Sequence, residues 1–362
     1  MSREISRLLA AALALVAVTP LAEAAAPGTI SEVANYQGAD RQAVLEEGAK
    51  KEGRVMIYTT GTQTQPLFEA LGKKYPFVRV ELYRAPTVDT TRRALEESKA
   101  GRPIADVFGL STGGLHALLD STLLQSYWST EMQIYRDETI EPKKHWVLDY
   151  ESYVNLGFNT KVISEQDAPK TYEDLLDPKW KGKMGASTRG QTIPNWLGVV
   201  LEEKGEDYLK KLGQQDIRTY KVSARGLANL VVSGEVALSP TIYSSHMANS
   251  KDKGASVEWR AIGPVNATIG AVALNRQAPH PHAAMLAIDF LLSREGQEMR
   301  KGLGYFSGRK DMETKQKPPK IHYLTERPDF LRGFEKWSSM ARQVFGTKEN
   351  PLPAGFVDSA EE

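Results

Sequence analysis

Three short stretches rich in hydroxyl and glycine residues could hold a small polar molecule. They cover residues 59–62, 111–114 and 187–191, and we place all three at the carboxyl edge of the predicted sheets, where ligands bind in α/β folds. Hydroxyls and the backbone N–H groups at the start of a helix bind anions and other strongly polar groups. The residues expected to contact the ligand in the first two stretches are Thr60, Gly61, Thr62, Ser111 and Thr112.

A second group of candidates lies further along the chain. Arg189 and Gly190 come just before a predicted helix that carries Pro194 in its first turn. A guanidinium beside a helix N-terminus suits a carboxylate, phosphate or phosphonate group, although Arg189 could equally be a solvated loop residue. Arg225 is a weaker candidate for the same role. Tyr243 follows a predicted strand end, where its side chain faces either the ligand or the core.

The run Gly109-Leu110-Ser111-Thr112-Gly113 allows a different chemistry. It matches G-x-S-x-G between a predicted strand and a predicted helix, which is the setting of the nucleophile in serine hydrolases. Ser111 would then be the nucleophile, and His246, His280 or His282 would be the base. An H-G-G-G oxyanion motif is missing from the sequence, and a match of five residues arises easily by chance. A secreted serine hydrolase therefore remains the alternative from another class.

The elements that must position these residues alternate between strand and helix. Predicted strands cover residues 54–58, 77–83, 104–110, 147–159, 236–238 and 268–274, and Pro240 is expected to end the fifth. Predicted helices cover residues 40–52, 66–75, 90–100, 114–121, 173–176, 195–212, 227–233, 282–292 and 330–344. This alternation predicts an α/β protein, in which ligands bind in a crevice at the carboxyl ends of the strands.

The N-terminus has the pattern of an export signal. Arg3 and Arg7 precede an apolar run at residues 8–18, and Ala22-Glu23-Ala24 provides a small-x-small cleavage site. Such a run is too short to span a bilayer, which takes about 20 residues. We therefore predict a signal peptide at residues 1–24. The remaining 362 − 24 = 338 residues exceed the length at which single cores usually split, so we expect two lobes.

Composition excludes several classes of protein. The sequence has no cysteine, which excludes disulfides, thiolate metal sites and the lipid-modified cysteine of a bacterial lipoprotein. Its 46 basic and 45 acidic residues form no basic stripe, so nucleic-acid binding is not expected. P-loop, G-x-G-x-x-G and H-E-x-x-H motifs are missing, and no cofactor is implied. We expect a soluble periplasmic monomer.

Several stretches resemble a known family. The most specific is the run D-P-K-W-K-G-K at residues 177–183. The others are residues 55–58, 105–108, 123–127, 156–160, 233–236 and 290–297. Together they cover most of the mature chain, which resembles the extracellular solute-binding proteins of family 1, the type II periplasmic receptors that include ferric-ion and polyamine binders.

The resemblance implies a two-lobed periplasmic-binding-protein-like α/β fold, with each lobe a mostly parallel sheet flanked by helices. Crossover hinge strands would join residues 27–150 and 261–303, the first lobe, to residues 151–260 and 304–362, the second. Such receptors are not enzymes. They close around a ligand and deliver it to an ABC permease in the inner membrane. A sensory receptor would share the fold and the binding step.

The resemblance also bears on the ligand. Ferric binders of this family use a histidine, a glutamate, two adjacent tyrosines and an anion. Here Thr62 and Ser111 stand about where the histidine and glutamate would be, and the tyrosine pair falls near Ser244-Ser245, just after Tyr243. These departures favour a small polar, anionic ligand. Ferric iron or a ferric complex, with Tyr243 as a metal ligand, is the alternative within the family.

Overall fold

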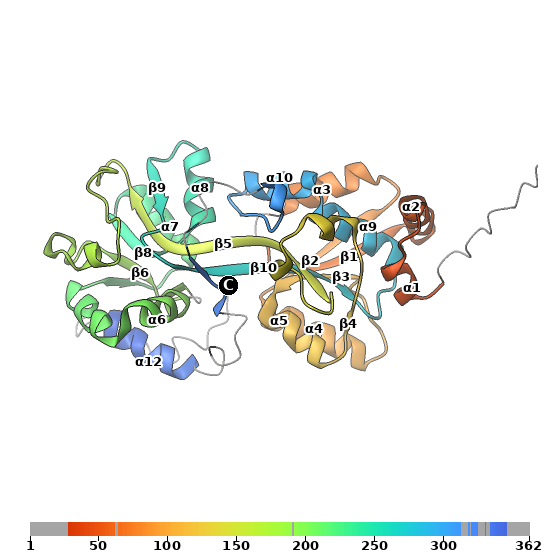
Figure 1. The fold of residues 1–362 in the computed structure, drawn as a ribbon, viewed down its shortest axis with the longest axis horizontal. Helices are drawn as coiled ribbons and strands as arrows, with labels where there is room; N and C mark the ends of the chain where they lie inside the picture. The colour runs from red at the N-terminus through yellow and green to blue at the C-terminus, as the bar shows by residue number, and fades with distance from the viewer. Residues whose placement is uncertain are drawn as a thin grey trace, which may run out of the picture.

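The computed structural model describes residues 28–61, 64–189, 192–312, 318, 320–324, 330 and 334–345. Figure 1 shows two lobes joined by the long strands β5 (Trp146–Asn159) and β10 (Val265–Asn275). The expected two-lobed α/β architecture is confirmed. The predicted signal peptide lies outside the described residues, as do Thr62 and Gly190. Within the described part of the chain, no helix has the length and apolar character needed to cross a membrane.

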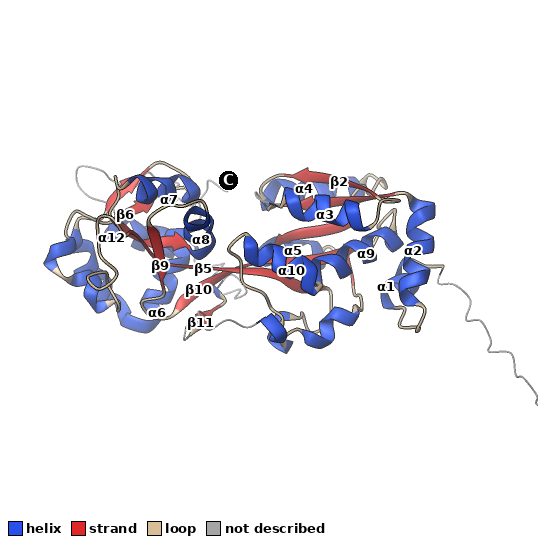
Figure 2. Ribbon diagram, turned by 90° about the horizontal axis from the view of Figure 1, so that it is seen from above, coloured by secondary structure: helices blue, strands red, loops and turns tan. Residues whose placement is uncertain are grey.

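The first lobe is built on a sheet whose strands run β2-β1-β3-β10-β5. Strand β1 (Arg54–Thr59) lies parallel to β2 (Arg79–Arg84) and β3 (Val107–Ser111), whereas β10 is antiparallel to β3. Helices cover both faces (Figure 2). They are α1 (Ile30–Asn35), α2 (Arg41–Glu52), α3 (Gln65–Lys74), α4 (Thr87–Lys99), α5 (Thr112–Asp120), α9 (Pro281–Leu292) and α10 (Arg294–Gly302).

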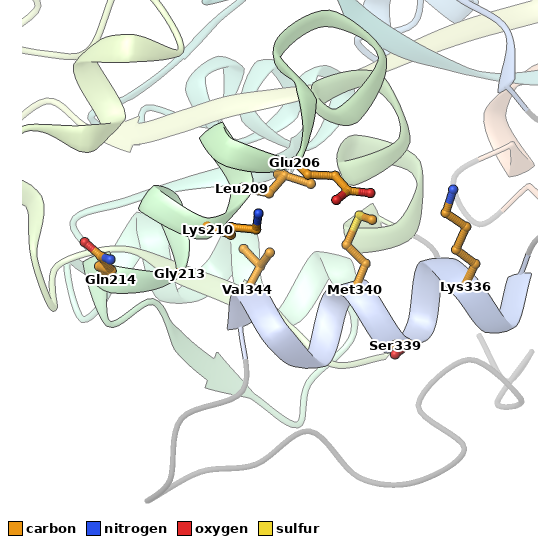
Figure 3. Close-up of a pocket in the computed structure, with 9 residues that line it drawn as sticks. All are labelled: Glu206, Leu209, Lys210, Gly213, Gln214, Lys336, Ser339, Met340 and Val344. Carbon is orange, nitrogen blue, oxygen red and sulfur yellow. The ribbon is translucent and has the colours of Figure 1, made fainter.

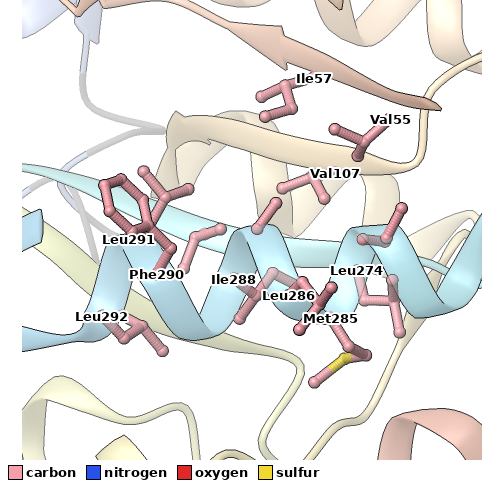
Figure 4. Packing of buried hydrophobic residues seen from close by; sticks show 14 of the residues in the cluster. Val55, Ile57, Val107, Leu274, Met285, Leu286, Ile288, Phe290, Leu291 and Leu292 are labelled. Atoms are coloured by element: carbon pink, nitrogen blue, oxygen red, sulfur yellow. The ribbon is translucent and has the colours of Figure 1, made fainter. Parts of the chain in front are cut away.

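Helix α9 forms the centre of this lobe's core. Its residues are apolar on almost every side, which is typical of a helix that is buried all round. In Figure 4, Leu286 and Ile288 of this helix pack beneath Val107 of β3 and near Ile57 of β1. Hydrophobic burial of this helix therefore holds the parallel strands in place, and with them the loops that follow their carboxyl ends.

The second lobe is arranged around the far end of β5. Strands β8 (Leu238–Tyr243) and β9 (Val257–Arg260) pair with β5, and β6 (Gly185–Ser187) pairs in parallel with β7 (Arg218–Tyr220). The helices are α6 (Thr192–Leu212), α7 (Ala224–Ser233), α8 (Ser244–Asp252) and α12 (Phe334–Phe345). The smaller elements of both lobes are β4 (Leu124–Gln125), β11 (Ile321–His322) and 3-10 helices at Thr130–Ile134, Asp137–Thr139, Glu173–Leu176, Pro178–Trp180, Gly213–Gln215 and Lys310–Met312.

One predicted strand boundary is wrong. Pro240 was expected to end the strand that begins near Val236, but β8 continues through it to Tyr243. The register between β8 and β5 shifts here, so that Pro240 and Thr241 both stand opposite Leu156. A proline lacks an N–H group and is accommodated at such a bulge, because no ladder hydrogen bond is required of it.

A third segment passes along the hinge after α10. The backbone N–H and C=O groups of Phe306 form hydrogen bonds of 2.9 and 2.8 Å with Glu151 of β5. Asn249 of α8 donates a 2.7 Å hydrogen bond to the carbonyl of Leu303. The segment therefore links the end of the first lobe to α8 in the second. The residue boundaries of the two lobes stay a prediction.

Candidate ligand-binding site

Three neighbouring strands bring polar groups to one place at the hinge. Ser111, the last residue of β3, pairs with Gly270 of β10, and Gly270 pairs with Tyr150 of β5. Directly opposed residues of antiparallel strands project from the same face of a sheet. A Cβ atom at Gly270 would lie 2.2 Å from Cε1 of Tyr150, so only glycine leaves room for this ring. Ser111 and Tyr150 therefore face the same side of the hinge.

The hydroxyl-rich loops of the first lobe lie beside one another. The N–H of Thr60 donates to the carbonyl of Gly109 at 3.2 Å, which joins the loop after β1 to the end of β3. The hydroxyl of Ser111 lies 3.1 Å from that of Thr87 at the start of α4. Gly61 and Thr112 are buried next to them. Four of the five residues predicted for this edge are thus brought together, and Thr62 is outside the described residues.

Three tyrosines gather at the hinge side of this edge. The rings of Tyr150 and Tyr305 have centroids 4.5 Å apart. Tyr243 pairs with Val154, four residues along β5 from Tyr150, and its electrostatic interaction with Tyr150 is one cause of the raised pKa of Tyr150. Burial is the main cause of the raised pKa of both Tyr150 and Tyr305. These two phenols are therefore neutral at physiological pH, so each O–H group can donate to a ligand.

Arg225 supplies positive charge next to these tyrosines. It lies in the first turn of α7, whose start is capped by a 3.0 Å hydrogen bond from the N–H of Gly226 to the hydroxyl of Ser223. Its Nη1 donates to the carbonyl of His246 at 3.0 Å, and its charge acts to lower the pKa of Tyr305. No carboxylate among the described residues forms an ion pair with it. Its positive charge is therefore available to an anion.

His246 adds no second charge to this region. Its ring lies 5.2 Å from the ring of Tyr243 at an interplanar angle of 77°. Burial, together with the positive charge of Arg225, lowers the pKa of His246 to about 4. A hydrogen bond with the backbone of Ala224 acts in the opposite direction. The imidazole is consequently neutral at pH 7, and the field here is set by Arg225.

Arg189 occupies a different setting from Arg225. Its backbone carbonyl accepts a 2.9 Å hydrogen bond from the hydroxyl of Ser187, and its N–H donates to the same hydroxyl at 3.2 Å. The residue is exposed, and among described residues no ion pair holds its guanidinium. The loop after β6 therefore places Arg189 at the start of α6, as expected, without fixing the direction of its side chain.

The geometry around Ser111 differs from that of a hydrolase. Ser111 ends β3, whereas Asp106, which pairs with His280 at 3.0 Å, precedes the same strand. His282 pairs with Glu52 at 2.7 Å, just before β1. These two histidines therefore lie at the opposite end of the sheet from Ser111. Within the described residues, no histidine forms a hydrogen bond with the Ser111 hydroxyl.

A large cavity lies away from these groups. It has a volume of about 650 Å³ and opens between α12 and the part of α6 that follows Gly205, where the helix is interrupted (Figure 3). Leu209, Met340 and Val344 line it, with Lys210 at its rim. This cavity contains none of the residues that follow the strand ends, so it is not part of the candidate site.

Sequence comparison identifies the family. A model of bacterial extracellular solute-binding proteins matches residues 103–324, which is more than half of the chain. The chain belongs to this family. An uncharacterized protein of Haemophilus influenzae is 26% identical over 270 residues, covering 69% of this chain and 76% of that protein. A Salmonella typhimurium protein, provisionally named a 2-aminoethylphosphonate-binding periplasmic protein, is 27% identical over 159 residues, covering 40% and 46%.

Solved structures share the fold. Iron-bound HitA from Pseudomonas aeruginosa superposes with a TM-score of 0.62 at 22% identity, covering 80% of this chain and 99% of that one. AfuA from Actinobacillus pleuropneumoniae, with bound fructose-6-phosphate, gives a TM-score of 0.57 at 23% identity, covering 81% and 97%. The chain is thus a solute-binding protein of ABC transport, from a family of transport proteins that bind small ligands and deliver them to permeases.

Two of the residues that gather here, Tyr150 and Tyr305, were not predicted from the sequence to contact the ligand. A signal for Tyr150 exists, because Tyr150, Ser152 and Val154 alternate with period two along one face of β5. Tyr305 follows Gly304 in the segment after α10 that passes along the hinge. It lies outside any periodic pattern of apolar residues in the sequence. Arg225 was a weaker candidate than Arg189, because a residue at the start of the predicted helix could lie on the surface. Nothing in the sequence shows that α7 begins next to α8.

Proposed function

We propose that this solute-binding protein captures a small phosphorylated or phosphonate anion between its lobes. The observation that carries the proposal is the guanidinium of Arg225, which lacks a carboxylate partner among the described residues and interacts with Tyr305. A charged donor held in this way forms strong, charge-assisted hydrogen bonds to phosphate oxygens. The neutral phenols of Tyr150 and Tyr305 would add hydrogen-bond donors and no further charge.

The first lobe supplies the complementary half of the proposed site. Thr60, Ser111 and Thr112 lie where β1 and β3 end, next to the starts of α3 and α5. The hydroxyls of Thr60 and Ser111 and the backbone N–H groups at the start of α5 would reach the ligand from the opposite side to Arg225. Because the two halves are joined through the hinge strands, ligand contacts that exist only when the lobes approach would favour the closed form.

The wider biological proposal follows from the family and the sequence. Removal of the predicted signal peptide would leave a soluble periplasmic monomer, with no lipid anchor because the sequence has no cysteine. The closed form would then deliver the anion to an ABC permease in the inner membrane. No cofactor is required for this cycle, and Ser111 acts in it as a hydrogen-bonding residue, not as a nucleophile.

Ferric iron is the second candidate ligand. Tyr150, Tyr243 and Tyr305 are hard oxygen ligands of a kind that suits Fe(III), and their grouping favours this alternative. Among described residues, however, no group of three or more His, Asp or Glu side chains could hold a metal ion. A ferric site would therefore depend on the phenols and on an added anion, for which Arg225 would again provide the charge.

Substitution of Arg225 tests the proposal. Arg225→Ala is expected to weaken binding of 2-aminoethylphosphonate or inorganic phosphate by about 1.5–3 kcal/mol, measured by isothermal titration calorimetry, because a charged hydrogen-bond partner is lost. Arg218→Ala is the matched control, since Arg218 is exposed and is the first residue of β7, at the end of the strand opposite to the start of α7. Equal affinities in both variants, or binding of ferric ion alone, would contradict the proposal.

A further inference from the structure

Buried polar atoms without partners occur on α6 and β10, two elements that are in contact with each other. Four side chains form this group, which we call the neutral subsite: Thr192 and Asn195 of α6, and Asn266 and Thr268 of β10. Their unpartnered atoms are Thr192 Oγ1, Asn195 Oδ1, Asn266 Nδ2 and Thr268 Oγ1. Three of the side chains are almost inaccessible, with exposed fractions of 1% for Thr192, 2% for Asn195 and 0% for Asn266. Native proteins rarely leave such groups unsatisfied, so each one requires an explanation.

The neutral subsite faces the same side of the hinge as the candidate anion site. On β10, Thr268 pairs with Ser152 and Gly270 pairs with Tyr150, two residues further along each strand. Side chains two residues apart on a strand share a face, so Thr268 projects on the same side as Tyr150. Thr192 and Asn195 are three residues apart and share one side of α6. Helix α6 is in contact with β10.

The orientation of Asn266 is fixed by the C-terminal segment. Its Oδ1 accepts a 3.2 Å hydrogen bond from the N–H of Leu324. Leu324 in turn lies against α6, because a Cβ atom at Gly198 would approach its Cδ1 to 2.6 Å. With the oxygen of the amide committed to Leu324, its Nδ2 group is left as a free donor. The subsite therefore offers an amide donor, an amide acceptor and two hydroxyls.

We propose that the neutral subsite recognises hydroxyl groups on the body of the ligand whose anionic group binds near Arg225. This inference rests on the proposed function. A ligand hydroxyl both donates and accepts, so it can satisfy Asn195 Oδ1 and Asn266 Nδ2 in turn. An ammonium group could only donate, and the subsite contains no carboxylate to balance its charge. The ligand class assigned in this way is a hydroxylated phosphate or phosphonate, such as a polyol phosphate.

Matched ligands and near-isosteric variants test the inference. Glycerol 1-phosphate and n-propyl phosphate are similar in size and differ in their hydroxyls. We expect the wild-type chain to bind glycerol 1-phosphate about tenfold more tightly, as measured by calorimetry. In Thr192→Val and Asn195→Leu, that preference is expected to fall to about twofold or less. In these variants the affinity for glycerol 1-phosphate should fall, and the affinity for n-propyl phosphate should stay unchanged.

A second readout separates recognition from a structural role. Replacing an unpartnered buried polar group by an apolar one of similar shape does not destabilise a protein. The melting temperature of ligand-free Thr192→Val should therefore equal or exceed that of the wild type. Thr139→Val is the control, because its buried hydroxyl donates a 2.6 Å hydrogen bond to the carbonyl of Arg136. That variant should melt about 2 °C lower and keep its ligand preference.

The outcomes distinguish the inference from the proposed function. Equal affinity of the wild type for the two ligands, or equal weakening of both ligands in the variants, overturns the neutral subsite and leaves anion capture in place. A lowered melting temperature of ligand-free Thr192→Val also overturns it, because the hydroxyl would then have a structural partner. Failure of the wild type to bind either compound or inorganic phosphate contradicts anion capture, and the inference falls with it.

Discussion

At the scale of single residues, His246 shows how burial limits the charge in the candidate site. A histidine next to an arginine would repel it if protonated, and burial removes the water that could stabilise the second charge. The pKa of His246 is lowered to about 4 for these reasons. Arg225 therefore keeps a constant electrostatic environment across the neutral range, and anion binding there should not depend on the titration of this imidazole.

The lowered pKa predicts a pH dependence of stability. The unfolded chain binds a proton at His246 near pH 6.5, whereas the folded chain does so near pH 4. The contribution of neutral His246 to the free energy of unfolding is thus fully present above pH 6.5. It is lost as the pH falls towards 4, and the loss is up to about 3 kcal/mol. Urea unfolding at pH 7 and pH 4.5 should show a smaller loss in His246→Gln than in the wild type. Equal losses would show that His246 does not titrate in this way.

The positions of some residues could be predicted from the sequence and those of others could not. Ser111 and Thr60 were predicted to lie at strand ends because hydroxyl residues follow apolar runs there, and the structure places them at the ends of β3 and β1. Tyr150 and Tyr305 come together through the pairing of β5 with β10 and the return of the chain after α10. Such contacts between distant segments leave no local pattern in the sequence, since each tyrosine by itself has the sequence context of an ordinary core residue.

At the scale of elements, the segment between α10 and the C-terminal region positions Tyr305. Gly304 has φ of 80°, and a Cβ atom there would lie 2.8 Å from Cβ of Ala248 and 2.9 Å from the carbonyl oxygen of Ser245. The close approach anchors the segment to α8 immediately before Tyr305. The contact between the rings of Tyr305 and Tyr150 therefore depends on a glycine that contacts the second lobe.

Substitution of this glycine should affect both stability and binding. Gly304→Ala is expected to lower the free energy of unfolding by more than about 1 kcal/mol, because a left-handed conformation is strained and the new methyl group meets α8. Ligand affinity should fall as well, because Tyr305 would be displaced. Gly101→Ala is the control: φ at Gly101 is 67° with no atom within 4 Å, so the strain alone remains. Chemical unfolding and calorimetry measure the two effects, and unchanged affinity in Gly304→Ala would remove Tyr305 from the site.

Several elements could be predicted, whereas others, such as α8, β6 and β9, were not. Periodic apolar residues predicted β1, α3 and β3 to within a few residues, because local packing against one core fixes these boundaries. The strand through Pro240 could not be predicted, because its continuation depends on a bulge opposite Leu156. A bulge is a property of two paired strands, and the sequence of one strand does not reveal it.

At the scale of the whole molecule, length and family resemblance predicted two lobes, and the structure shows how they are joined. Strands β5 and β10 run through the centre of the molecule (Figure 1), and the segment around Phe306 adds a third connection. The groups proposed to bind the anion belong to the first lobe, the hinge and the second lobe. Binding at this place should therefore change the position of one lobe relative to the other, whereas binding in the cavity beside α12 should not.

Small-angle X-ray scattering of the mature chain, with and without a saturating phosphate compound whose binding has been established by calorimetry, tests the central claim most directly. Binding between the lobes predicts a smaller radius of gyration for the wild type with ligand. Arg225→Ala at the same ligand concentration should keep the ligand-free value. Measured binding without any compaction of the wild type would contradict capture of the anion between the lobes.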